Sequence, residues 1–268
     1  MEFKELGKSG VKAPEIGLGT WQYSGGVEPL RTGISQGAFL IDTAEMYGTE
    51  GIVGETVKGL RDKVLIATKV SGNHLRYDEV LRAAEESLKR LGTGTIDLYQ
   101  VHWPDPGVPM RETMRAMEML VDRGLVRFIG VSNFYLKNLE EALASLTKYP
   151  IACNQVKYSL LDREIEEEIL PYCEKNQITI LAYSPLARGG LTAKPLLKNR
   201  QAMTALQRIA RESGKTMAQV ALNWCVSKPN VIAITKSNRA ERIVEACAAS
   251  GWRLAPEQLK TLDEAFRQ

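Results

Sequence analysis

The chain has 268 residues, of which 44% are hydrophobic and 25% are charged. This apolar share is too large for a disordered chain and suffices for a substantial core. The formal net charge is only +3, which argues against a binder of nucleic acid or another polyanion.

Membrane and metal-binding classes are also disfavoured. No run approaches the ~20 apolar residues of a membrane span, and Met1–Glu5 does not resemble a signal peptide. The four cysteines are widely spaced without a C-x-x-C pair, and two histidines offer few zinc ligands. We therefore expect reduced thiols, no metal site, no membrane contact and a cytoplasmic protein.

Eight short runs are almost continuously apolar, which is typical of parallel strands buried on both faces. In chain order they are Ile16–Gly19, Phe39–Ile41, Val64–Ile66, Ile96–Tyr99, Phe128–Val131, Ile151–Asn154, Thr179–Ala182 and Val231–Ile234.

Between these runs, apolar residues recur every three or four positions, the spacing of a helix with one buried face. Such helices are predicted at Tyr77–Leu91, Thr113–Arg123, Leu139–Leu146 and Glu164–Lys175. Alternating strands and helices imply right-handed βαβ units. Eight of these units in about 250 residues match an α/β fold, the (β/α)8 TIM barrel.

Two segments lie outside the eight units. Phe3–Leu6 and Val11–Ala13 flank Lys8-Ser9-Gly10 and predict an N-terminal β-hairpin. Pro256–Phe266 predicts a C-terminal helix with proline in its first turn. No linker or low-complexity tract divides the chain, so we expect residues 1–268 to form a single barrel domain.

The competing fold is a doubly wound nucleotide-binding sheet, which usually carries G-x-G-x-x-G after its first strand. Gly17 and Gly19 supply only G-x-G, because the next glycine is Gly25. The glycines of residues 48–54 also have the wrong spacing, and we interpret them as a loop entering a helix. The missing fingerprint favours the barrel.

Polar residues follow the predicted strands at their carboxyl ends, where the catalytic groups of parallel barrels lie. Each alone has an ordinary structural explanation, such as a helix cap for an aspartate or a solvated loop position for a lysine. Together they are expected to converge at one face of the barrel. They are Asp42, Tyr47, Lys69, His102, Ser132, Asn133, Asn154, Gln155, Tyr183, Ser184, Lys236 and Ser237.

The first four of these residues suit the reduction of a carbonyl group. A tyrosine phenol has a pKa near ~10, so at neutral pH Tyr47 can donate its proton. We expect the Lys69 ammonium to lower the pKa of Tyr47, and Asp42 to keep Lys69 charged. His102 would orient the carbonyl. The protein supplies no hydride, so a cofactor is required.

Seven motifs in strand order resemble those of the aldo-keto reductases, and the resemblance runs through nearly the whole chain. They are Ile41–Gly48 (IDTAEMYG), Thr68–Val70 (TKV), Asp97–Pro104 (DLYQVHWP), Ile129–Phe134 (IGVSNF), Asn154–Val156 (NQV), Tyr183–Leu186 (YSPL) and Thr235–Ser237 (TKS).

This resemblance implies Tyr47 as general acid in reduction and general base in the reverse direction, assisted by Asp42, Lys69 and His102. It also implies NADPH or NADP+ as the cofactor. The residues implied to bind it are Thr20, Trp21, Asp42, Ser132, Asn133, Gln155, Tyr183, Ser184, Leu186, Lys236, Ser237, Arg242 and Glu245.

The implied contacts fall into groups along the cofactor, with Glu245 at the adenine. The 2′-phosphate would be gripped by Lys236, Ser237 and Arg242. The pyrophosphate would meet Ser184 and the backbone near Leu186. The nicotinamide would be held by Ser132, Asn133 and Gln155, with Tyr183 stacked on its ring.

The resemblance further implies a substrate site with an aromatic mouth, suited to an apolar or aryl aldehyde. The loop from Trp103 to Pro109 is short, and the sequence ends at Gln268 directly after its last predicted helix. We therefore expect an open pocket with broad aldehyde tolerance, and we assign His74 to a loop without a role. The residues of the mouth are Trp21, Tyr47, His102 and Trp103.

The leading hypothesis is a cytoplasmic, NADPH-dependent reductase of aldehydes and some ketones, for which a monomer is favoured but the oligomeric state is left open. A second hypothesis is an NADPH-binding regulatory subunit that senses redox state through a partner protein. A third, a phosphate-handling isomerase using Ser184, Lys236 and Ser237, does not explain Tyr47 and Lys69. The intact tetrad favours the enzyme, and the sequence leaves the natural substrate open.

Overall fold

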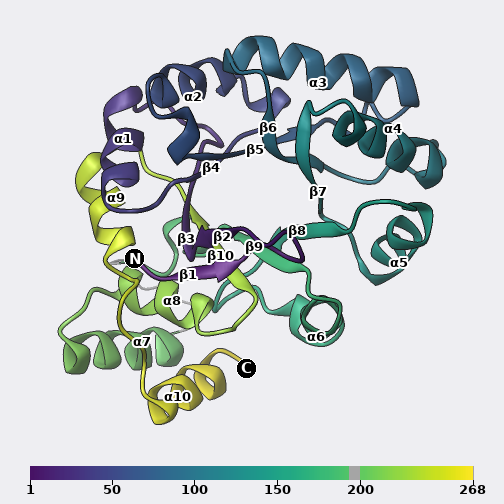
Figure 1. The fold of residues 1–268 in the computed structure, drawn as a ribbon. Helices are drawn as coiled ribbons and strands as arrows, with labels where there is room; N and C mark the ends of the chain where they lie inside the picture. The colour runs from purple at the N-terminus through teal and green to yellow at the C-terminus, as the bar shows by residue number, and fades with distance from the viewer. Residues whose placement is uncertain (193–199, 268) are drawn as a thin grey trace.

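Eight parallel strands close into a barrel in the order β10-β3-β4-β5-β6-β7-β8-β9, which confirms the predicted fold (Figure 1). This computed structural model describes residues 1–192 and 200–267, so Gln268, the expected end of the domain, lies outside the described residues. The strands are β3 (Ile16–Gly19), β4 (Leu40–Asp42), β5 (Leu65–Val70), β6 (Ile96–Val101), β7 (Val126–Ser132), β8 (Ile151–Lys157), β9 (Thr179–Tyr183) and β10 (Val231–Thr235).

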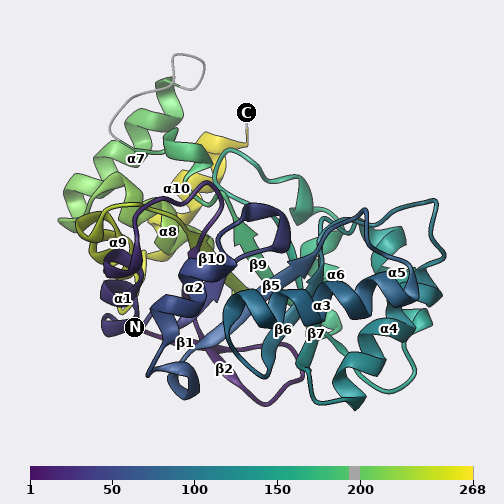
Figure 2. The same ribbon diagram turned by 90° about the horizontal axis from the view of Figure 1, so that it is seen from above.

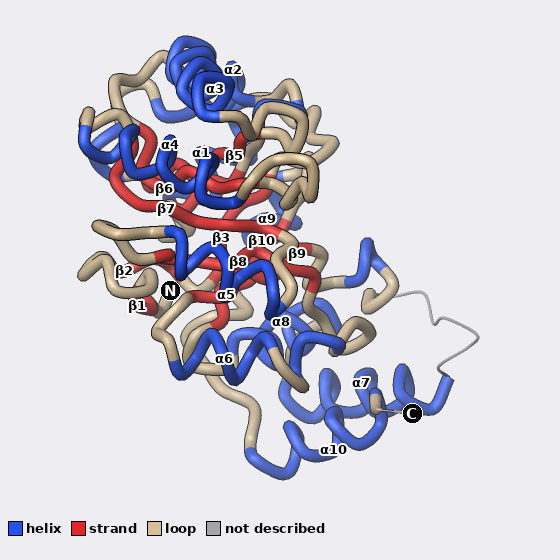
Figure 3. Tube along the Cα trace, turned by 90° about the vertical axis from the view of Figure 1, so that its right-hand side faces the viewer, coloured by secondary structure: helices blue, strands red, loops and turns tan. Residues whose placement is uncertain are grey.

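Helices surround this barrel on its outside (Figures 1 and 2). Two further helices, α7 (Arg200–Ser213) and α10 (Pro256–Phe266), pack beside each other away from the strands (Figure 3). The surrounding helices are α1 (Val27–Ser35), α2 (Glu50–Val57), α3 (Tyr77–Leu91), α4 (Met110–Asp122), α5 (Leu136–Ser145), α6 (Ile169–Lys175), α8 (Met217–Val226) and α9 (Ala240–Cys247).

The strands are apolar almost throughout because both of their faces are covered. All residues of β3, β4, β5 and β6 are buried. Side chains such as Leu40, Leu65, Leu98 and Ile232 pack together inside the barrel, while the alternate residues pack against the helices. Layers of this kind fill the interior of a parallel barrel and leave the strand ends to hold polar groups.

The N-terminal hairpin closes one end of the barrel. β1 (Phe3–Glu5) pairs antiparallel with β2 (Lys12–Pro14), as predicted. Leu6 and Ala13 at its base are fully buried and join the interior cluster of the barrel. Because this end is covered, the carboxyl ends of the strands provide the open face.

Lys4 on β1 fastens the hairpin to the last βα unit. Its partly buried Nζ donates to the carbonyl oxygens of Val226 at 2.6 Å, Lys228 at 2.6 Å and Val231 at 2.7 Å. Three acceptors match the three N–H groups of an ammonium. The segment between α8 and β10 is thus tied to the start of the chain.

The helices differ from the predictions in several places, since α1, α7, α8 and α9 have no counterpart among the predicted ranges. The single helix predicted at Glu164–Lys175 is wrong, because a 3-10 turn (Glu164–Glu166) precedes the separate helix α6. Pro171 explains the break: its ring would clash with the carbonyl of residue 167 in a continuous helix, whereas the first turn of α6 accommodates it. α8 lacks a predicted counterpart because nearly all of its residues are buried, so it shows no one-sided stripe.

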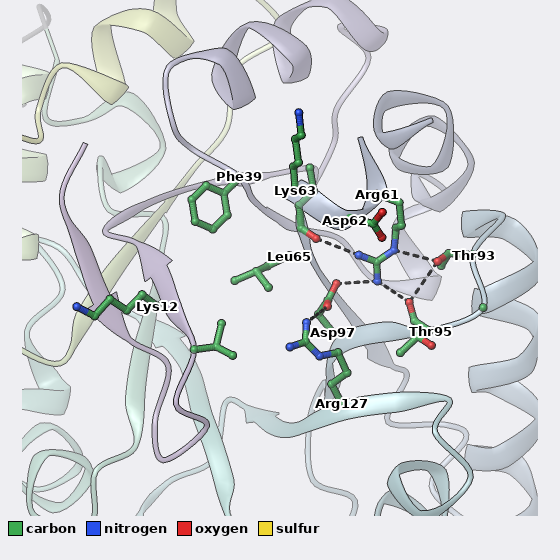
Figure 4. A pocket seen from close by; sticks show the side chains of 13 residues that line it. Lys12, Phe39, Arg61, Asp62, Lys63, Leu65, Thr93, Thr95, Asp97 and Arg127 are labelled. Atoms are coloured by element: carbon green, nitrogen blue, oxygen red, sulfur yellow. Dashed lines mark hydrogen bonds and ion pairs between the residues drawn. The ribbon is translucent and has the colours of Figure 1, made fainter. Parts of the chain in front are cut away.

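A cavity of about 620 Å³ lies at the opposite end from the strand carboxyl ends, beside the hairpin (Figure 4). Three of its charged groups, Arg61, Asp97 and Arg127, are engaged in structural contacts. The buried Asp97 carboxylate contacts Arg61 Nη2 and Arg127 Nη1, each at 2.7 Å. Arg61 also donates to the carbonyl oxygens of Val64 and Thr95. This network joins the amino ends of β5, β6 and β7.

The structure also bears on the cysteines and on the length of the helices. Cys153, Cys173, Cys225 and Cys247 are all free and buried. In residues 1–192 and 200–267, every helix is too short or too polar to cross a lipid bilayer.

Candidate active site

A second cavity, of about 990 Å³, opens at the carboxyl ends of the strands. The βα loops bring almost every residue implied by the motifs to its wall. Three of the predicted residues, Thr20, Lys69 and Asn154, lie outside the lining. Asn154 is fully buried and donates from Nδ2 to the carbonyl oxygen of Phe134 at 2.9 Å. The predicted residues that do line it are Trp21, Asp42, Tyr47, His102, Trp103, Ser132, Asn133, Gln155, Tyr183, Ser184, Leu186, Lys236, Ser237, Arg242 and Glu245.

Thr20 lies beneath the cavity floor and is fully buried. Its hydroxyl contacts the carbonyl oxygen of Asp42 at 3.0 Å and the Thr49 hydroxyl at 2.9 Å. Thr49 in turn contacts the Thr43 hydroxyl at 2.9 Å. Thr20 therefore fixes the end of β4, and the expected direct contact with a cofactor is not supported by its position.

Asp42 and Lys69 form a buried ion pair. Lys69 Nζ donates to Asp42 Oδ1 at 2.9 Å, to Oδ2 at 2.8 Å and to the carbonyl oxygen of Thr43 at 2.8 Å. Burial lowers the pKa of Lys69, and the Asp42 charge opposes this effect. The expected role of Asp42, to keep Lys69 charged and fixed, agrees with this geometry.

Tyr47 projects into the cavity from a 3-10 turn (Glu45–Tyr47) directly after β4. Gly48 ends this turn at φ 68°, a left-handed conformation that glycine adopts at little cost. The Tyr47 hydroxyl lies 3.5 Å from Lys69 Nζ and 3.3 Å from His102 Nε2. The predicted convergence of Asp42, Tyr47, Lys69 and His102 is thus seen in the structure.

The expected effect of Lys69 on the phenol is wrong for the protein alone. Burial raises the pKa of Tyr47 far above its ordinary value, and the nearby charge of Asp42 raises it further. Asp42 neutralises Lys69, so the ammonium does not outweigh the loss of solvent. The phenol is therefore firmly protonated at neutral pH.

His102 is a neutral imidazole that packs against Trp103. Burial, with the Lys69 charge as a second cause, lowers the pKa of His102 to about 3. Nδ1 is buried without a partner among the described residues. The tautomer with its proton on Nε2 avoids a buried N–H group without an acceptor. The ring stacks on Trp103 with centroids 3.7 Å apart.

The side chains after β7, β8 and β9 form one hydrogen-bonded wall. Asn133, held in a left-handed conformation at φ 58°, donates from Nδ2 to the carbonyl oxygen of His102 at 3.0 Å. Its Oδ1 accepts from the Tyr183 hydroxyl at 3.0 Å. The Ser132 hydroxyl donates to the Gln155 carbonyl oxygen at 3.0 Å. The residues expected to bind the nicotinamide therefore lie together in one place.

The residues predicted after β10 to bind the 2′-phosphate all line the cavity, but one of them has an additional contact. Lys236 and Ser237 follow the strand directly and line the cavity. Arg242 on α9 also lines it, but its Nη1 forms an ion pair with Glu245 Oε2 at 2.6 Å. A ligand phosphate at Arg242 would therefore have to compete with Glu245 for the guanidinium.

Sequence reasoning missed Arg188, which adds a cation to the cavity wall. It lies in the 3-10 turn Ala187–Gly189 after β9, and Ser184, Ala187 and Arg188 all have positive φ angles between 48° and 54°. These left-handed residues direct the loop along the cavity. The sequence signal that could have identified it is a basic residue two positions after the YSPL motif.

The aromatic mouth is open. Trp21 and Trp103 are 49% and 42% exposed, and Trp21 meets the Tyr47 ring edge-on with centroids 5.0 Å apart. The connection from β6, which ends at Val101, to α4, which begins at Met110, is short. His74 lies in the loop between β5 and α3, where its Nδ1 is 3.1 Å from Glu45 Oε1.

This arrangement can hold a carbonyl oxygen against one phenol and one neutral imidazole.

Comparison with known proteins identifies the fold and the family. The sequence model of the Aldo/keto reductase family matches residues 15–267. The methylglyoxal reductase YeaE of Escherichia coli is 38% identical, covering 99% of this chain and 96% of the relative. The aldo-keto reductase YhdN of Bacillus subtilis is 35% identical, covering 98% of this chain and 93% of that protein.

Solved structures agree closely. The thermostable aldo-keto reductase Tm1743, in complex with the inhibitor epalrestat, superposes with a TM-score of 0.92 at 42% identity, covering 99% of this chain and 100% of that one. An aldo/keto reductase from Klebsiella pneumoniae, in complex with NADP and acetate, has a TM-score of 0.89 at 36% identity, with 99% and 96% coverage.

Proposed function

Because this chain belongs to the aldo/keto reductase family, we propose that it reduces small aldehydes and some ketones to alcohols with NADPH. The observation that carries the proposal is the Tyr47 hydroxyl on the cavity floor, between Lys69 Nζ and His102 Nε2. The domain would comprise the whole chain, residues 1–268.

The cavity has the size and polarity that a dinucleotide needs. Its volume of about 990 Å³ is at the upper end of the range for ligand sites. The amides of Asn133 and Gln155 bond to His102 and Asp42 beside Tyr47. The cations Arg188, Lys236 and Arg242 line the same cavity from the loops after β9 and β10 and from α9. We assign the amide end to the nicotinamide and the cationic end to the phosphates. NADPH, when bound, supplies the hydride that the side chains cannot.

Tyr47 is the proposed proton donor to the carbonyl oxygen. Lys69 donates toward its oxygen, and the proton on His102 Nε2 provides a second donor to the same atom. With both contacts directed at the phenol oxygen, the phenolic O–H remains free to point into the cavity. When the proton leaves, Lys69 and His102 stabilise the phenolate that forms.

The substrate site would accept compact, partly apolar carbonyl compounds. Trp21 and Trp103 give flat apolar surfaces, and Tyr47 and His102 supply the polar groups that orient the carbonyl. The named relatives include a methylglyoxal reductase and a glyoxal reductase. A first substrate panel should therefore contain methylglyoxal together with aryl aldehydes.

The test measures NADPH oxidation by the wild type and by Tyr47→Phe, with Tyr99→Phe as the matched control. Tyr99 is buried and its hydroxyl has no partner in the described residues, so its loss removes no hydrogen bond. Loss of the general acid predicts a kcat lower by about 10²–10⁴-fold, with NADPH affinity within about twofold. The Tyr99 variant should keep full activity.

Equal kcat values for the wild type and Tyr47→Phe would remove Tyr47 as the proton donor. Tight NADPH binding by the wild type without turnover of any carbonyl compound would instead support the redox-sensing subunit.

A further inference from the structure

Gln100 on β6 is a buried polar residue that the proposed chemistry does not use. It is fully buried inside the barrel. Strand pairing places it next to Lys69 on β5 and Gly130 on β7. A Cβ atom at Gly130 would lie 2.8 Å from Gln100 Cγ and 2.6 Å from Cys153 Sγ. The glycine therefore leaves room for the Gln100 side chain in the layer beneath His102.

The amide of Gln100 joins the two groups on either side of it. Nε2 donates to Asp42 Oδ1 at 3.3 Å. Oε1 accepts from Gln155 Nε2 at 3.4 Å and lies 3.6 Å from Cys153 Sγ. Gln155 Nε2 also donates to Asp42 Oδ1, at 2.7 Å. Gln100 thus links the carboxylate of the buried ion pair to a residue of the cavity wall.

These contacts fix which way the Gln155 amide faces. Both acceptors, Asp42 Oδ1 and Gln100 Oε1, require its Nε2 on the inner side. A flip would bring Gln155 Oε1 against two acceptor oxygens, which is unfavourable in a dry interior. Gln155 Oε1 is therefore directed away from them and has no hydrogen bond within the described residues, so it is free to accept one from a ligand in the cavity.

We propose that Gln100 is a positioning residue that holds the Gln155 amide with its oxygen toward the nicotinamide carboxamide. This inference rests on the proposed cofactor site. Gln100 does not touch the cofactor, so it acts through Gln155. Without Gln100, one N–H of Gln155 loses its acceptor and the amide is held by Asp42 alone.

Gln100→Met removes the polar atoms while nearly keeping the length and volume of the side chain. Leu98→Met, one layer below on the same strand, is the control for repacking of the barrel interior. Two ligands distinguish positioning from general damage: NADP+, and 2′-phospho-ADP-ribose, which lacks the nicotinamide. Binding is measured by calorimetry, and thermal unfolding confirms that each variant is folded.

Gln100→Met should bind NADP+ about three- to tenfold more weakly, the effect of one net hydrogen bond. The fragment should bind within about twofold of the wild type, and Leu98→Met should bind both ligands normally. Equal weakening of both ligands, or no change in either, would overturn the proposal. A wild type that binds neither ligand would instead overturn the proposed function.

Gln100→Glu adds a test that a purely structural role does not predict. When protonated, the new carboxyl can donate to Asp42 and accept from Gln155 as glutamine does. When ionised, it places a second negative charge beside Asp42. The titratable groups facing residue 100 are Asp42 from β4, Lys69 from β5 and Cys153 from β8, with Tyr47 and His102 beside them at the cavity floor.

The affinity of Gln100→Glu for NADP+, relative to the wild type at the same pH, should therefore fall as pH rises from about 5.5 to about 8.5. The fragment serves as the reference at each pH. A ratio of the two affinities that stays constant over this range would contradict the proposed link to Gln155.

Discussion

Removal of the Lys69 ammonium should destabilise the fold as well as the site. Lys69 is 0% exposed and contacts both oxygens of Asp42, whose side chain is 5% exposed. In Lys69→Met the carboxylate keeps, among the described residues, the amide donors Gln155 at 2.7 Å and Gln100 at 3.3 Å. Leaving one charge of a buried pair uncompensated costs about 3–5 kcal/mol, so the free energy of unfolding should fall by that amount.

A double-mutant cycle tests this reasoning. Asp42→Asn in the Lys69→Met background removes the uncompensated charge, so the double variant should recover about 2 kcal/mol or more of the loss. The assay is urea unfolding at pH 7, followed by tryptophan fluorescence. If Lys69→Met costs less than about 1 kcal/mol, or if the two losses simply add, the pair is not coupled in the way the geometry indicates.

Three further predictions follow from particular contacts. Burial lowers the pKa of His102 to about 3 in the folded protein, whereas its pKa in the unfolded chain is about 6.5. The unfolded state therefore binds the proton first, and the free energy of unfolding should fall as pH drops from about 6.5 towards 3. In His102→Asn, the urea midpoint of unfolding should fall less over this range. The double variant Lys236→Ala, Arg242→Ala should weaken NADPH binding about 10- to 100-fold, the scale of charge-assisted hydrogen bonds. NADH, which lacks the 2′-phosphate, should bind nearly as it does to the wild type. An unchanged ratio of the NADPH and NADH affinities would exclude the assignment of these residues to the 2′-phosphate. Gly130→Ala should lower the free energy of unfolding by about 1–3 kcal/mol, because the added Cβ overpacks against Cys153 and Gln100. The control is Gly51→Ala, an exposed position on α2 with nothing within 4 Å of the added Cβ. In the same urea assay this control should be neutral or stabilising.

The strands and the polar residues at their ends could be predicted because both have a strong local signal. Strands covered on both faces are continuously apolar, and chemistry follows at the carboxyl end, so Asp42, Lys69 and His102 stood at recognisable positions. α3 and α10 were predicted at their observed bounds, since one has a clear stripe and the other a proline in its first turn.

Other properties depend on three-dimensional surroundings and had no such signal. The raised pKa of Tyr47 arises from burial and from Asp42, whereas the sequence only indicated a nearby lysine. Gln100 stood inside a strand motif, and its role depends on the space beside Gly130 and on contacts with two other strands. The ion pair of Arg242 with Glu245, three residues apart on one helix, could have been expected from spacing alone.

The Lys4 contacts bear on the order in which the chain can assemble. Its carbonyl acceptors belong to residues 226–231, and β10 supplies the pairing partner of β3. The ring therefore cannot close, nor the first strand lose its open edge, until almost the whole chain has left the ribosome. Such distant pairings make folding slow. The partly synthesised protein carries unpaired strand edges, so chaperone binding at this stage should matter more for yield than it does for the finished barrel.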